Sequence, residues 1–160
     1  MSDRIEHIKA ELEASRAHLM AIVDAVDGRW EARVYSDGLE WTVRQLLNHL
    51  ADAERGHYNQ VINIAEGRDI IPPDFDIERY NASVTRKTAD KTAEQALQDL
   101  TKSRGKLVFW LDSLDDSKLD QKGRHASLRI LTVAQILEVV AAHERGHADD
   151  IAAALGISIE

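Results

Sequence analysis

The sequence has no cysteine, only two prolines among 160 residues, and no long uninterrupted apolar run. Without cysteine there can be no disulfide, thiolate metal ligand or cysteine nucleophile, so any metal must be held by nitrogen and oxygen atoms. No segment approaches the roughly 18 apolar residues of a membrane-spanning helix, and residues 1–20 are charged throughout. We therefore expect a cytoplasmic protein without a membrane span.

Basic residues are also scarce relative to acidic ones. The chain carries 28 Asp and Glu against 20 Lys and Arg, a formal net charge of -8, and no stripe of basic and aromatic side chains. This balance repels polyanions, so nucleic acid is not an expected partner. The length predicts one domain over residues 1–160, and the abundance of Ala, Leu, Glu and Lys favours helix over sheet.

Helical spacing of apolar residues predicts four long helices. They run from about Asp3 to Val26, from Thr42 to Glu66, from Thr92 through Leu111, and from Thr132 to Leu155. The last three open with Thr-x-x-Gln, the spacing of a capping box. We also expect a turn at Asp37–Gly38, a short helical segment from Ile77 to Thr85, and connecting loops elsewhere. The fold class is therefore all-α, with a four-helix bundle as the simplest architecture.

Two segments 90 residues apart resemble each other. "WTVRQLLNHLADAERGH" (41–57) aligns without a gap on "LTVAQILEVVAAHERGH" (131–147), and nine of the seventeen positions are identical. Convergence on a common capped amphipathic helix would explain some identities, but the shared "ERGH" favours a true repeat. The second and fourth helices are therefore predicted to be related by approximate two-fold symmetry.

His143 and His147 are four residues apart, so at about 100° per residue they project from one helix face. Such a pair can hold a metal, although in an isolated case two hydrogen-bonded core histidines are the more common outcome. A third imidazole could come from His49 or His57 on the second helix, and helix geometry alone does not choose between them.

The repeat also predicts an asymmetry. Ala53 and Val139 stand at the repeat positions of His143 and His49. A metal would therefore bind at one site only, and the matching position would be lined by small or apolar groups.

Other polar side chains have weaker claims to a site. Glu54 and Glu144 could orient imidazoles or act on a metal-bound water, but we favour structural pairing with arginine for both. Glu54 is kept as the weak candidate for a catalytic residue. His7, His18 and His125 are expected to be solvated or locally hydrogen-bonded.

The segments "WTVRQLLNHLADAERGHYNQ", "FDIERYNASV", "KTAEQALQDL" and "LTVAQILEVVAAHERGHADDI" together resemble the DinB-like (DinB/YfiT) metalloenzyme family over essentially the whole chain. The resemblance implies that His49, His143 and His147 bind a divalent metal, which selects His49 over His57. It also implies an up-down-down-up bundle with a long crossover between the second and third helices, and a homodimer. Many members carry a histidine where this chain has Gly146.

A divalent cation on three imidazoles could activate water or a small-molecule thiol. Nickel or zinc is the foremost expectation, with iron or manganese as further candidates, and the resemblance adds a low-molecular-weight thiol as a possible cofactor. We expect a metal-dependent enzyme acting on a small molecule, with thiol transfer somewhat ahead of hydrolysis. The alternative is a non-enzymatic helical stress-response or binding protein with a structural or vestigial metal site.

Overall fold

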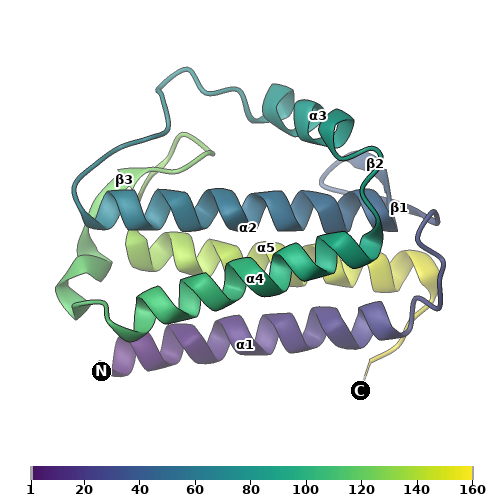
Figure 1. Cartoon of the computed structure of the whole chain (residues 1–160), viewed down its shortest axis with the longest axis horizontal. Helices are drawn as coiled ribbons and strands as arrows, with labels where there is room; N and C mark the ends of the chain where they lie inside the picture. The colour runs from purple at the N-terminus through teal and green to yellow at the C-terminus, as the bar shows by residue number, and fades with distance from the viewer. Residues whose placement is uncertain (1, 160) are drawn as a thin grey trace.

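The computed structural model describes residues 2–159, and four long helices lie side by side in it (Figure 1). They are α1 (Asp3–Asp24), α2 (Val43–Ala65), α4 (Ala93–Asp112) and α5 (Val133–Leu155). Helix α1 packs mainly on α5, and α2 packs on both α4 and α5. Along the chain, α1 and α5 run in one direction and α2 and α4 in the other (Figure 1). The predicted up-down-down-up four-helix bundle is confirmed.

The crossover between α2 and α4 carries a further helix, α3 (Ile77–Lys87). Asp76 begins it, because the Asp76 carboxylate accepts a hydrogen bond from the Arg79 backbone N–H at 3.1 Å. Helix α3 contacts α2 and lies outside the bundle (Figure 1). The crossover therefore covers one face of α2, and its helix α3 lies where the short helical segment from Ile77 was predicted.

Two β-hairpins stand where the sequence predicted loops. Each precedes one of the repeat-related helices, and the second follows a short 3-10 helix, η1 (Asp116–Asp120). The strands are β1 (Arg33–Ser36), β2 (Leu39–Thr42), β3 (Lys122–Arg124) and β4 (Ile130–Thr132). Strands of three or four residues are too short to produce a recognisable alternation of apolar and polar residues. The expected turn at Asp37–Gly38 closes the first hairpin, with φ angles of 53° and 74°.

The three predicted capping boxes are all present. The Thr42, Thr92 and Thr132 hydroxyls accept hydrogen bonds from the backbone N–H three residues later, at 3.0–3.1 Å. In each box the glutamine side chain accepts a bond from the threonine N–H in return. Thr42 and Thr132 also end β2 and β4, so each hairpin delivers the chain directly into its helix.

Buried apolar side chains form two clusters, one toward each end of the bundle. The first cluster includes Leu19, Val23, Trp41, Leu46, Leu50, Leu100 and Ile151. The second includes Ile5, Leu12, Val61, Leu107, Leu111, Ile136 and Val140. Between the two clusters, each of the four long helices contributes one buried or half-buried charged side chain to a layer at the middle of the bundle.

This charged layer consists of Arg16, Glu54, Arg104 and Glu144, one residue from each long helix. Arg16 bonds Glu54 and Glu144, each at 2.8 Å. Arg104 bonds Glu54 at 2.9 and 3.0 Å and Glu144 at 3.3 Å. The layer follows the pseudo-two-fold relation, because Glu54 and Glu144 are repeat counterparts and each contacts both arginines.

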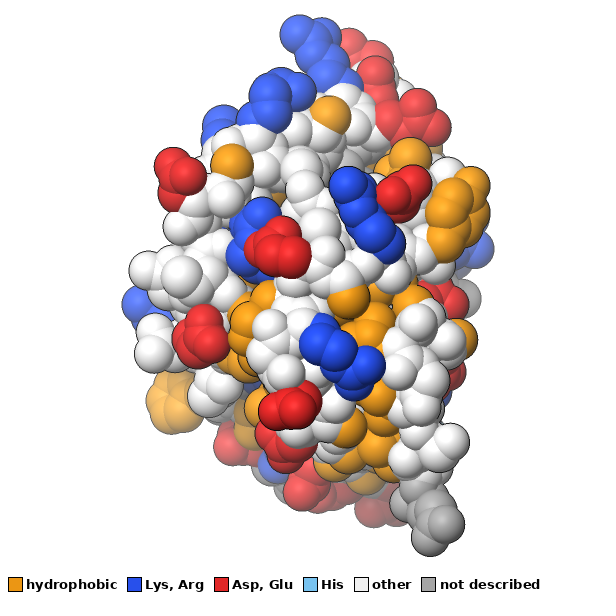
Figure 2. Space-filling model, turned by 90° about the vertical axis from the view of Figure 1, so that its right-hand side faces the viewer, with side chains coloured by type: hydrophobic (Ala, Val, Ile, Leu, Met, Phe, Trp, Pro, Cys, Tyr) orange, Lys and Arg blue, Asp and Glu red, His pale blue; other side chains and the backbone are white. Residues whose placement is uncertain are grey.

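The surface at one end of the bundle mixes Lys and Arg with Asp and Glu, with apolar side chains between them (Figure 2). Among residues 2–159, no helix combines the length and apolar character required to cross a membrane.

The close packing of β3 on α2 leaves no room for a side chain larger than that of Gly123. A methyl group at this position would lie 2.4 Å from Ile64 Cγ1 and 2.7 Å from its Cδ1. We expect Gly123→Ala to lower the free energy of unfolding by about 1–3 kcal/mol, because buried Ile64 must move. Gly105→Ala on α4 is the control, since its methyl group meets nothing within 4 Å. That control should gain about 0.5–1 kcal/mol in helix propensity, and urea titration of both variants checks the pair.

Candidate metal centre

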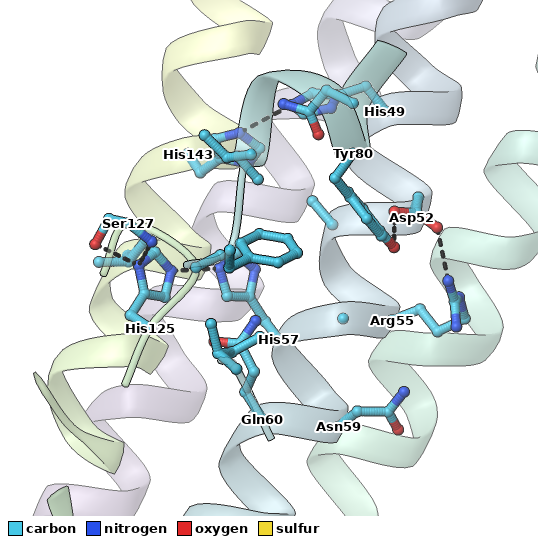
Figure 3. Close-up of a pocket in the computed structure, with 18 of the residues that line it drawn as sticks. His49, Asp52, Arg55, His57, Asn59, Gln60, Tyr80, His125, Ser127 and His143 are labelled. Atoms are coloured by element: carbon cyan, nitrogen blue, oxygen red, sulfur yellow. Dashed lines mark hydrogen bonds and ion pairs between the residues drawn. The ribbon is translucent and has the colours of Figure 1, made fainter. Parts of the chain in front are cut away.

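Three imidazoles converge where α2 meets α5. The Nε2 atom of His143 lies 3.0 Å from Nε2 of His147 and 3.2 Å from Nε2 of His49. The α5 pair is one helical turn apart, and His49 comes from α2. Figure 3 shows His49 beside His143. The structure therefore brings together the three residues that the resemblance selected.

The first hairpin orients His147. Ser36 donates its hydroxyl proton to the Asp150 carboxylate, and the same Ser36 Oγ lies 2.7 Å from Nδ1 of His147. Since the hydroxyl proton is already used, Nδ1–H of His147 is the donor to Ser36. The lone pair of His147 is then on Nε2, which faces the other two imidazoles. This is the usual way in which a hydrogen-bond partner fixes the tautomer of a metal-binding histidine.

Asp37 is a further charged group beside the three imidazoles. Its Oδ2 lies 3.2 Å from Nε2 of His147, and its side chain is mostly exposed. Neither Ser36 nor Asp37 was predicted as part of a site. They precede His147 by more than a hundred residues, and only the packing of the first hairpin on α5 brings them there. The sequence showed only the Asp37–Gly38 turn.

Burial keeps the three imidazoles uncharged. It lowers the pKa of His49 and of His147 to about 3, and the neighbouring imidazoles add to the effect. The pKa of His143 is lowered for the same reason. Neutral imidazole is the form that binds metal ions.

The spacing of the nitrogens is close to that of a metal site. Two nitrogens bound at about 2.1 Å to one tetrahedral ion lie roughly 3.4 Å apart. The observed Nε2 separations of 3.0 and 3.2 Å are close to this value. Three neutral imidazoles suit zinc, nickel, copper or iron, so the residues fit a divalent transition metal.

His57 does not join the three imidazoles. Its Nε2 lies 2.8 Å from Nε2 of His125, and the two rings are nearly parallel, at 6°. His125 also bonds Ser127, as the expectation of a local hydrogen bond required. Its burial and its pairing with His57 were not foreseen, because His125 stands in a polar connector that the second hairpin folds against α2.

The remaining sequence candidates lie elsewhere. His7 is exposed, and His18 bonds Asp149 at 2.6 Å. The carboxylates of Glu54 and Glu144 are held by the arginines of the charged layer rather than by the imidazoles. The structure therefore does not place the catalytic candidate Glu54 among the Nε2 atoms of His49, His143 and His147.

A cavity of about 400 Å³ opens beside the three imidazoles. His49 and His143 line one part of it, and His57 and His125 line another (Figure 3). The crossover supplies an apolar wall that includes Ile70, Ile71, Phe75, Ile77 and Tyr80.

Ala53 and Val139 also line this cavity, together with His57. These three residues are the repeat counterparts of His143, His49 and His147. The cavity therefore occupies the position that mirrors the three imidazoles. The sequence predicted small or apolar groups there.

Comparison with known proteins gives a family match. The sequence model of the DinB superfamily matches residues 11–151. The chain is 28% identical over 138 residues to "Putative metal-dependent hydrolase YfiT" of Bacillus subtilis (strain 168), covering 85% of this chain and 75% of that protein. It is 23% identical over 145 residues to "Putative metal-dependent hydrolase OB0413" of Oceanobacillus iheyensis, covering 91% and 82% respectively.

Solved structures support the same fold. The solved structure of B. subtilis YfiT, described as having an unusual four-helix bundle topology, superposes with a TM-score of 0.75 at 24% identity, over 99% of this chain and 91% of that one. A protein of Clostridium difficile 630 superposes with a TM-score of 0.72 at 17% identity, over 99% of both chains.

Proposed function

Because the chain belongs to the DinB superfamily, we propose that it is a divalent-metal-dependent enzyme whose metal is held by His49, His143 and His147. The observation that carries the proposal is the convergence of three neutral imidazoles through Nε2, beside a cavity of about 400 Å³. Two relatives are named as metal-dependent hydrolases, which favours water over a thiol as the nucleophile.

Each group of the site has a distinct role in this proposal. A divalent cation held by His49, His143 and His147 would supply Lewis acidity and would lower the pKa of a water or thiol bound to it. Ser36 and Asp150 hold His147 in the tautomer that presents Nε2. Asp37 lines the cavity beside His147 and can accept a proton from the nucleophile at Oδ2.

Thiol transfer is the second candidate reaction. The chain has no cysteine, so the thiol must be a small molecule that enters the cavity. Chromogenic esters incubated with zinc- or nickel-loaded protein, with and without small thiols, distinguish the two reactions. Cleavage without thiol supports hydrolysis, whereas a thiol-bearing product supports transfer. A metal-loaded protein that performs neither reaction across such a panel would favour the non-enzymatic binding role.

Metal content tests the ligand assignment directly. Protein purified without an affinity tag is expected to bind about one metal ion per chain after incubation with zinc or nickel. His143→Ala should bind none, and His49→Gln should lose most of the metal. His57→Gln is the matched control, because His57 is equally buried on α2 but bonds His125 instead. Ser36→Ala should weaken the affinity by roughly 10–100-fold through loss of the orienting bond.

The opposite pattern would reject the assignment. If His57→Gln removes the metal while His49→Gln retains it, the third ligand is His57. If His143→Ala binds metal as the wild type does, the α5 pair is not the site. Mass spectrometry of metal in dialysed samples gives the stoichiometry, and competition with a chelator gives the affinity.

We also propose, from the family resemblance, that the protein is a cytoplasmic homodimer acting on a small molecule. Light scattering is then expected to return twice the chain mass of 17.9 kDa. A value of one chain mass at working concentration would reject the dimer.

A further inference from the structure

Gln60 carries an unpartnered polar atom at the wall of the cavity. The residue is only 5% exposed, and it lies on α2 three residues beyond His57. Its Oε1 is buried and has no hydrogen-bond partner among the residues that the structure describes. Leaving such an atom unpaired costs free energy, so a bound group that pairs with it would be stabilised. Gln60 lines the cavity, and Figure 3 places it beside His57.

The neighbouring histidines are arranged as a hydrogen-bonded chain. The backbone N–H of Ser127 donates to Nδ1 of His125 at 3.1 Å, so the proton of His125 is on Nε2. That proton is donated to Nε2 of His57 at 2.8 Å. His57 is also bonded by the backbone of Ala53, one turn earlier on α2. Both rings are therefore held in place and uncharged, because burial lowers the pKa of each.

The part of the cavity next to His57, Gln60 and His125 is its inner end. Among the described lining residues, no cationic side chain lies at this inner end. The one arginine in the lining, Arg55, binds Asp52 at 2.7 Å, and its side chain is 58% exposed. Tyr80 donates to the same Asp52 at 2.9 Å. In Figure 3 these three side chains lie apart from His57 and Gln60. A carboxylate or phosphate placed beside Gln60 would find no cationic lining side chain to pair with it. Arg129, whose charge acts on His125, is exposed and bonds Ser127.

The inner end lies close to the three imidazoles. The ring centroids of His57 and His143 are 6.4 Å apart, and Gln60 follows His57 by three residues on α2. The apolar crossover wall lies along the same cavity. A small ligand with an apolar portion against this wall can therefore reach both ends.

We propose that Gln60, with His57 and His125, forms a subsite for an uncharged substrate group that both donates and accepts hydrogen bonds, a carboxamide or a hydroxyl. A group that both donates and accepts can pair with either atom of the Gln60 amide, whichever of its oxygen and nitrogen is turned toward the ligand. The inference rests on the proposed function, in which the reacting bond lies by His49, His143 and His147. The subsite then selects uncharged, partly apolar substrates over anionic ones.

The test uses metal-free protein and three probes of similar size: benzamide, benzyl alcohol and benzoate. NMR is used to follow the side-chain amide signal of Gln60 and the ring signals of His57 and His125. We expect benzamide or benzyl alcohol, but not benzoate, to shift these signals in a saturable manner. Gln60→Leu should weaken binding of the uncharged probe by roughly five- to tenfold, the effect of losing one hydrogen bond.

Asn59→Leu is the matched control. Asn59 also carries an amide and lies on α2, but Figure 3 shows it away from His57 and His125. This variant should keep the wild-type affinity for the uncharged probe. Benzoate binding as tight as benzamide binding, or unchanged benzamide binding in Gln60→Leu, would overturn the subsite. So would the absence of any shift at Gln60, His57 and His125 with all three probes.

The experiment separates the subsite from the metal site. Because the probes bind metal-free protein, a failure to bind metal leaves the probe result standing. Conversely, Gln60→Leu should retain about one metal ion per chain, so failure of the subsite leaves the metal assignment intact.

Discussion

Arg104→Met is expected to lower the free energy of unfolding by about 3–5 kcal/mol, because it breaks a buried ion network. The Arg104 side chain is 11% exposed, and those of Glu54 and Glu144 are 3% exposed. Arg104 also donates to the Leu12 carbonyl at 2.7 Å. After the substitution, Arg16 alone would have to balance two buried carboxylates. Urea unfolding at pH 7 measures the loss.

A surface substitution of the same kind serves as the control. Arg4 bonds Asp116 and Asp120, but its side chain is 47% exposed. Arg4→Met should therefore change stability far less than Arg104→Met, because water screens exposed ion pairs. The double variant Arg104→Met/Glu54→Gln should recover part of the loss by removing one buried charge. Equal effects of Arg4→Met and Arg104→Met would contradict a stabilising role for the charged layer.

Metal-free protein is expected to lose stability steeply as the pH falls from about 6.5 toward 3. The folded-state pKa values of His49, His57 and His147 are lowered to about 3 from the ordinary 6.5. In this window the unfolded chain binds protons that the folded chain does not, so stability rises with pH and is fully present above 6.5. Within this window, each such histidine lowers the free energy of unfolding by about 1.4 kcal/mol for each pH unit of acidification. Three of them lower it by about 4 kcal/mol per unit. We therefore expect acid unfolding near pH 5.

Urea titrations at pH 7, 6 and 5 with a chelator present measure this dependence. His49→Gln should reduce the slope by about one proton, because one group no longer takes up a proton on unfolding. His7→Gln should keep the wild-type slope, since His7 is exposed on α1. Stability that is constant between pH 7 and 5 would contradict the burial of neutral imidazoles.

The long helices could be predicted from the sequence because their signals are local. The Thr42, Thr92 and Thr132 capping boxes lie within four residues of chain, and the apolar spacing continues over several turns. The hairpins could not be predicted in this way. Their strands are three or four residues long and are stabilised by packing against helices far along the chain.

The site was harder to predict, because its geometry depends on how the helices are placed along the bundle axis. His49 and His57 are both buried on α2, two turns apart, so helical spacing does not say which one lies opposite the α5 pair. The glutamates show the same limit. Pairing with arginine was expected, but the partners Arg16 and Arg104 come from α1 and α4. Ser36 and Gln60 carried no recognisable motif.

The groups around His147 come from distant parts of the chain: Ser36 and Asp37 from the first hairpin, His49 from α2, and His143 and Asp150 from α5. No fragment that lacks either the first hairpin or the last helix contains all of them. If the proposed metal binds at these groups, its capture during refolding is expected to be a late event, because it requires closure of a long chain loop. A cobalt absorption signal followed after dilution from urea would report completion of the native topology, whereas far-ultraviolet circular dichroism would report the earlier formation of the helices.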